Sequence, residues 1–69
     1  MNEKIYLTFA KEVVECRRYG YEGYDELHNL FMVLIANDLL ADYQLDFLKR
    51  CFFCDMDELI SNSEFHINL

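Results

Sequence analysis

Cys51 and Cys54, separated by two residues, have a spacing that recurs in metal and redox sites. Together with Cys16 and with His28 or His66, they could supply four tetrahedral zinc ligands. Zinc knuckles place this spacing in tight, polar or glycine-rich turns, and redox sites place it at a helix N-terminus, where the dipole lowers the thiol pKa. Here two phenylalanines separate the cysteines, and the pair ends an amphipathic segment. We therefore expect buried structural cysteines, with no metal site and no cofactor.

The remaining polar residues do not form a catalytic pattern. Neither histidine has a serine or cysteine placed by the sequence to make a nucleophilic pair. Thirteen Asp and Glu make close carboxylates unavoidable. An acid/base pair, however, needs a cleft that separates two pKa values, and a chain this short has little room for one. We expect a protein that is not an enzyme, and a small zinc or thiol-active protein is the lesser alternative.

Charge and hydrophobicity limit the classes of partner. The formal net charge of −7 opposes direct nucleic-acid binding, which depends on Lys and Arg displacing counterions. The longest uninterrupted apolar run, residues 31–36, is far shorter than the roughly 18 residues that a membrane span needs. Three cysteines, an odd number, and a start without a signal-like apolar run predict a reducing, cytoplasmic setting.

The first segment that positions the cysteines and polar side chains is predicted to be an amphipathic helix over residues 2–18. Its apolar side chains collect on one broad side at 100° per residue, and this pattern continues to Cys16. Asn2 can cap the start, and Gly20 can take the left-handed conformation that ends a helix. Apolar residues also alternate at the beginning, as in a strand, but the longer helical pattern favours the helix.

The second segment, residues 25–40, is apolar on every side, with Asp25 as its expected N-cap and a fraying end at Asn37 or Asp38. A helix that is apolar all round is buried all round. We therefore expect it to be the central element or to pack against another subunit.

The third helix is expected over residues 43–54 with Asp42 as N-cap. Phe53 falls on its polar side, so the C-terminal tail or a partner must cover that ring. Asp55 and Glu58 resemble a capping box for a short last helix that ends near residues 61–63. Alternating apolar residues from Phe65 onward suit an extended tail. The predicted fold is all-α, a single domain over residues 1–69 with three main helices, a short C-terminal helix and an extended tail.

Two sets of residues are candidates for a protein-binding surface. Carboxylates on a rigid face attract a basic partner, although negative charge also serves simply to keep small proteins soluble. The acidic set is Asp38, Asp42, Asp46, Asp55, Asp57 and Glu58. Tyrosine is enriched at binding surfaces because it combines a large area with a polar tip. For the tyrosines of the loop at residues 19–24, we favour the alternative to a binding role, which is that their rings cover the end of the bundle. The aromatic set is Tyr19, Tyr21, Tyr24 and Phe53.

These features predict a non-enzymatic module that binds another protein and inhibits or regulates it. In kind, the chain resembles the small acidic proteins with which bacteriophages and mobile elements inhibit host factors. Its carboxylates could imitate the phosphates of DNA in a basic groove, as in a nucleic-acid mimic. The alternative function is structural, because eleven aromatic residues and an all-round apolar helix exceed what one small core can cover. We therefore also expect a homodimer.

Overall fold

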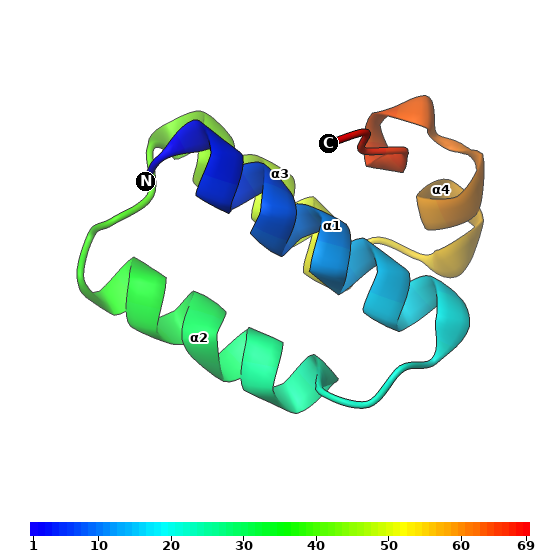
Figure 1. Ribbon diagram of the computed structural model, residues 1–69, viewed down its shortest axis with the longest axis horizontal. Helices are drawn as coiled ribbons and strands as arrows, with labels where there is room; N and C mark the ends of the chain where they lie inside the picture. Colours follow the sequence, from blue (N-terminus) through cyan, green and yellow to red (C-terminus); the bar gives the residue numbers. More distant parts are fainter.

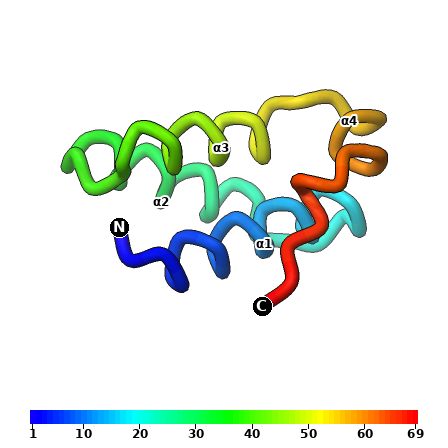
Figure 2. The backbone as a smooth tube through the Cα atoms, turned by 90° about the horizontal axis from the view of Figure 1, so that it is seen from above, coloured from blue at the N-terminus to red at the C-terminus, as the bar shows by residue number.

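A computed structural model covers residues 1–69, and every regular element in it is helical. The order is α1 (Glu3–Tyr19), α2 (Tyr24–Ala36), α3 (Asp42–Phe53), α4 (Met56–Ser61) and a 3-10 turn (Ser63–Phe65). Figure 1 shows α1 and α2 side by side and antiparallel, with α3 passing behind α1. In Figure 2 the C-terminal segment folds back across α1. The chain is a small all-α bundle of three main helices with a short C-terminal helix, as the sequence predicts.

The central helix is α1, which packs against α2, α3 and α4. The side-chain oxygen of Asn2 accepts hydrogen bonds from the backbone N–H groups of Lys4 at 2.9 Å and Ile5 at 3.3 Å. Gly20, at φ 68°, ends the helix in the left-handed conformation that glycine adopts without strain. The helical pattern therefore predicted this segment correctly, and the alternative strand at its start is wrong.

The ends of α2 differ from the prediction by a few residues. The helix begins at Tyr24, because Gly23 at φ 105° is its N-cap and the predicted cap, Asp25, lies within the first turn. It ends near the expected fraying point, where Asp38 takes a left-handed conformation at φ 53°. The backbone N–H of Leu39 then bonds to the carbonyl oxygen of Leu34 at 3.0 Å, which closes the C-terminus in the manner of a Schellman motif.

The position of α2 corrects the sequence prediction. The helix was expected to be the central element or to pack against another subunit, and within the chain only Phe31 and Leu34 of α2 are buried, so α2 is not the central element. Leu30 is 46% exposed and Val33 is 52% exposed. The longer α1 occupies the centre instead, since it alone has helices packed along several of its sides. The apolar surplus of α2 therefore lies on the surface.

The cap of α3 also differs from the prediction. The expected N-cap, Asp42, is the first residue of the helix, and Ala41 is the N-cap. Because alanine has no capping oxygen, the side-chain oxygen of Gln44 reaches back and accepts the Ala41 backbone N–H at 3.0 Å. At the next helix start, the expected half of the capping box is present, since the Asp55 carboxylate accepts the Glu58 backbone N–H at 2.9 Å.

The second half of that capping box is absent, and the extended tail begins one residue later than expected, after a 3-10 turn that includes Phe65. The carboxylate of Glu58 lies 3.4 Å from Arg50 and forms an ion pair with it rather than returning to the cap. In the 3-10 turn, the side chain of Asn62 caps the Glu64 N–H at 2.9 Å. Only the residues after this turn lack regular structure.

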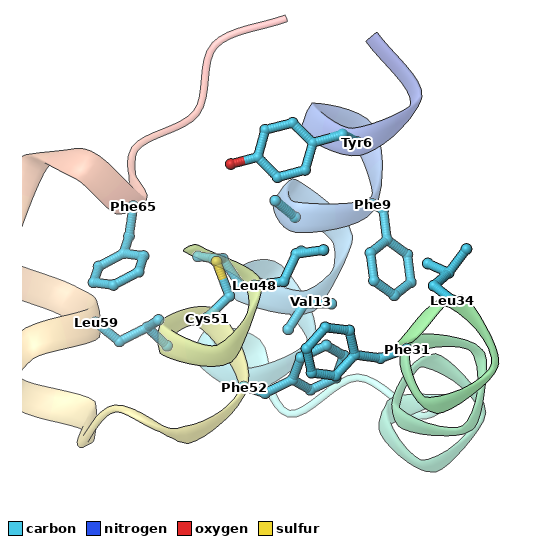
Figure 3. Close-up of a cluster of buried hydrophobic side chains, with 12 residues drawn as sticks. Tyr6, Phe9, Val13, Phe31, Leu34, Leu48, Cys51, Phe52, Leu59 and Phe65 are labelled. Atoms are coloured by element: carbon cyan, nitrogen blue, oxygen red, sulfur yellow. The ribbon is translucent and has the colours of Figure 1, made fainter. Parts of the chain in front are cut away.

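Aromatic side chains join the helices in the core (Figure 3). The rings of Phe31 on α2 and Phe52 on α3 stack at a centroid distance of 4.7 Å. Phe65 brings the tail onto α3, where its ring stacks on Phe47 at 5.6 Å. Offset or edge-on contacts of this kind add about 0.5–1.5 kcal/mol each beyond the burial of apolar area. The core thus lies between α1 and the faces of α2, α3 and the tail that meet it.

The C-terminus of α3 is capped by side chains from the other helices. The guanidinium of Arg17 donates to the carbonyl oxygen of Cys51 at 2.8 Å and also to that of Cys54. The hydroxyl of Tyr24 donates to the carbonyl oxygen of Phe52 at 3.0 Å. Helix C-termini leave such carbonyls without intrahelical partners, and a cation there complements the helix dipole. No helix of the bundle has both the length and the apolar character that crossing a membrane requires.

Candidate functional site

The largest surface hollow of the protein lies between α1 and α2 and has a volume of about 420 Å³. We call it the α1–α2 groove. Its lining combines apolar side chains with four carboxylates and contains no lysine or arginine. The lining residues are Glu12, Glu15, Cys16, Tyr21, Glu22, Gly23, Glu26, Leu27 and Leu30.

Helical spacing and the short interhelical loop build this groove. On α1, Glu12 and Cys16 are four residues apart and therefore share one face. On α2, Glu26 and Leu30 share a face in the same way. The loop needs positive φ at Gly23 and closes the groove at the end where α1 turns into α2. The result is an apolar floor with acidic side chains around it.

The three arginines of the bundle are directed away from the groove. Arg17 and Arg18 donate to backbone carbonyls of α3 and α4. Arg50 pairs with Glu64 at 2.5 Å and with Glu58.

In the groove itself, only Glu15 has an ion-pair partner, Lys11 at 3.9 Å. The carboxylates of Glu12, Glu22 and Glu26 form no ion pair. The groove therefore keeps a negative field that an incoming cation can satisfy.

A second hollow extends the groove along α1. It has a volume of about 310 Å³ and shares Glu12 with the first. Its other lining residues are Lys4, Ile5, Thr8 and Phe9. Ile5 is 58% exposed, and Lys4 is the only cation that lines either hollow. The combined surface is acidic near the loop and more apolar toward the start of α1.

Two of the cysteines, Cys16 and Cys51, lie in settings that disfavour thiolate chemistry. Burial raises the pKa of Cys16, with smaller contributions from Glu26 and Glu12, and its thiol donates to the Tyr21 carbonyl at 3.1 Å. Burial also raises the pKa of Cys51 to about 12. Reactive thiols need the reverse, a lowered pKa in an electropositive setting. No three or more His, Cys, Asp or Glu side chains are grouped so that they could hold a metal ion.

The structure does not bring the predicted acidic set together. Asp38, Asp42 and Asp46 lie at or near the start of α3, and Asp55 and Asp57 follow its end. The twelve residues of α3 span about 18 Å at 1.5 Å per residue, so roughly that length separates Asp42, the first residue of the helix, from Asp55 beyond its end. Glu58, the sixth member of the set, is paired with Arg50.

The predicted aromatic set divides in the same way. Tyr19 and Tyr21 are both exposed, and their ring centroids lie 5.5 Å apart at the rim of the bundle. Tyr24 is half-buried and points its hydroxyl at α3. Phe53 is 60% exposed, and the ring of His28 lies 5.8 Å from it. The aromatic surfaces therefore lie on two flanks of α2, one beside the groove and one beside α3.

The sequence analysis did not identify the groove carboxylates as a set. None of Glu12, Glu15, Glu22 and Glu26 belongs to the predicted acidic set. The available signal was two pairs of like charges three and four residues apart, one on the first helix and one that runs from the loop into the first turn of the second. Of these four carboxylates, only that of Glu15 has an ion-pair partner within the fold.

The arrangement can bind a surface that has both basic and apolar side chains. Its carboxylates can accept hydrogen bonds from lysine or arginine, and its floor can cover apolar side chains. Neither histidine contributes to the lining of the groove. Comparison with protein-family models, with curated proteins and with solved structures finds no match to this chain.

Proposed function

We propose that this protein is a non-enzymatic binding module that inhibits or regulates a partner protein through the α1–α2 groove. The observation that carries the proposal is the combination of an exposed apolar floor with three carboxylates that lack any cation partner. Charge without apolar area would serve solubility alone, and apolar area without charge would favour non-specific association. Together they favour a specific partner with basic and apolar side chains.

An inhibitor of the type used by bacteriophages and mobile elements fits this proposal, because such a protein needs only to cover a functional surface of its target. Mimicry of a nucleic acid is one form of it. A mimic would compete with DNA or RNA for a basic groove, and its binding would weaken strongly with salt. A partner that binds mainly through the apolar floor would lose less affinity as salt rises.

The experiment places a photo-crosslinking amino acid at Leu30, inside the groove, and in a second variant at Asp57, outside it. We expect the Leu30 variant to form a covalent adduct with one protein in the native host. The adduct should disappear when Glu12, Glu22 and Glu26 are changed to glutamine. Adducts from the Asp57 position alone, or adducts unaffected by the glutamine changes, would refute the groove as the contact surface.

A second candidate function is assembly into a homodimer. It is favoured by the other flank of α2, where His28 lies beside the exposed ring of Phe53. Met32 follows His28 by four residues and Ile35 by seven, so they extend the same helical face. We call these four residues the α2–α3 patch. Unlike the groove it contains no carboxylate, so two copies could meet there without repulsion.

A further inference from the structure

We infer that the α1–α2 groove receives an amphipathic α-helix of its partner, with apolar residues on one face and lysine or arginine concentrated at one end. This inference rests on the proposed function and adds the form of the partner's binding element. Helix-in-groove recognition uses apolar anchors at helical spacing together with complementary charge at the rim.

The geometry of two antiparallel helices suits a third helix. The 17 residues of α1 and the 13 of α2 correspond to lengths of about 25 Å and 20 Å. The two hollows that share Glu12 provide an elongated surface rather than a closed cavity.

The side of α1 that contacts α3 carries Arg17, whereas the groove lies on the side with Glu12 and Glu15. A docked helix would therefore occupy the flank of α1 and α2 away from α3.

The apolar residues of the groove follow helical spacing. Leu27 and Leu30 form part of its floor, and Val33 continues the same face of α2 by three residues. In the second hollow, which continues the groove, Ile5 and Phe9 contribute from α1 at a spacing of four. Ridges of side chains at such spacings match the grooves of another helix. An extended peptide would find no unpaired strand edge here, because the bundle contains no sheet.

The charge distribution sets the orientation of the docked helix. The four carboxylates lie toward the loop between α1 and α2, and Lys4 lines the opposite end. The basic residues of the partner helix should therefore lie at the loop end. A second copy of this chain is a poor occupant, because it would bring its own four carboxylates against these.

The test uses two synthetic peptides of identical composition. The first repeats the heptad Leu-Lys-Lys-Leu-Leu-Lys-Leu, which forms an amphipathic helix, and the second alternates leucine and lysine as closely as the composition allows, which favours an extended strand. Fluorescence anisotropy measures the affinity of each labelled peptide for the full chain. We expect the helical peptide to bind at least tenfold more tightly, a difference that corresponds to about 1.4 kcal/mol.

Two variants with equal changes in charge identify the surface that the peptide uses. The groove variant carries Glu12→Gln, Glu15→Gln, Glu22→Gln and Glu26→Gln, and the control variant carries Asp38→Asn, Asp42→Asn, Asp46→Asn and Asp57→Asn. Circular dichroism checks that both are folded. Affinity for the helical peptide should fall at least tenfold further in the groove variant than in the control variant.

The outcomes separate this inference from the proposed function. If both peptides bind equally well and both lose affinity only in the groove variant, the groove is still a protein-binding site but the helix inference is wrong. If the two variants lose affinity equally, binding follows net charge alone and both proposals fail. Self-association in the absence of peptide that is abolished in the groove variant would overturn the choice of occupant.

Discussion

Replacing Arg17 with methionine should destabilise the fold more than any other change of a surface cation. Methionine keeps an unbranched apolar side chain in place of the methylene groups of arginine. It removes the guanidinium, which donates to the carbonyl oxygens of Cys51 and Cys54. A hydrogen bond from a charged group contributes about 1.5–3 kcal/mol. Since Arg17 is half-buried, the lower value applies, and two bonds give about 3 kcal/mol.

Urea unfolding followed by far-UV circular dichroism measures this loss. Domains of this size are marginally stable, with total free energies of unfolding near the lower end of about 5–15 kcal/mol, so a loss of about 3 kcal/mol is easily resolved. Arg17→Lys should recover part of the stability, because an ammonium group cannot reproduce the two-pronged geometry of the guanidinium. The matched control is Lys11→Met on the same helix, where the pair with Glu15 at 3.9 Å is exposed and contributes less than about 1 kcal/mol. An Arg17→Met variant within about 0.5 kcal/mol of the parent, which is the effect of an ordinary surface substitution, would refute the capping role.

Three further predictions follow from other contacts. Tyr24→Phe should lower the free energy of unfolding, measured in urea, by about 1 kcal/mol, because the hydrogen bond from the hydroxyl to the Phe52 carbonyl oxygen at 3.0 Å is lost while the ring remains. An unchanged free energy would mean that water replaces this bond equally well. Burial raises the pKa values of Tyr6 and Cys51 to about 12, so both groups hold their protons more tightly in the folded chain than in the unfolded chain. The contribution of these two groups to the free energy of unfolding should therefore be fully present below about pH 9 and should be lost as the pH rises toward 12. Cys51→Ala should make this decrease less steep, and an unchanged slope would contradict the role of Cys51. Sedimentation should show a dimer that Met32→Ser with Phe53→Ser converts to a monomer without loss of helicity, whereas a parent that is already monomeric would remove the α2–α3 patch as a self-association surface.

The sequence predicted the helices well because their signals are local. The cap at Asn2, the left-handed Gly20 and the cap at Asp55 each act over a few residues, and all three occur as expected. The predicted cap is two residues late at Asp25 and one residue late at Asp42, because the actual caps use the glycine conformation of Gly23 and the side chain of Gln44 instead of the nearest carboxylate.

The position of α2 could not be predicted from its composition. Its all-round apolar pattern indicated burial, but burial depends on how many other helices pack against a helix. The longer α1 packs against α2, α3 and α4, so it is α1 that occupies the centre. The groove was missed for a related reason. Glu12 and Glu26 are far apart in the sequence and come together only when α1 and α2 pack antiparallel. The predicted acidic set was instead chosen by proximity in the sequence, and α3 separates its two halves.

The central claim is that the α1–α2 groove is the surface that contacts a basic, apolar protein segment. The most direct measurement is the map of amide chemical shift changes when the helical leucine–lysine peptide is titrated into the isotope-labelled chain. The account predicts that the largest changes fall on Glu12, Glu26 and Leu30, with little change from Met56 to Ser61. Changes centred instead on the carboxylates that flank α3, or spread evenly over the acidic surface, would contradict it.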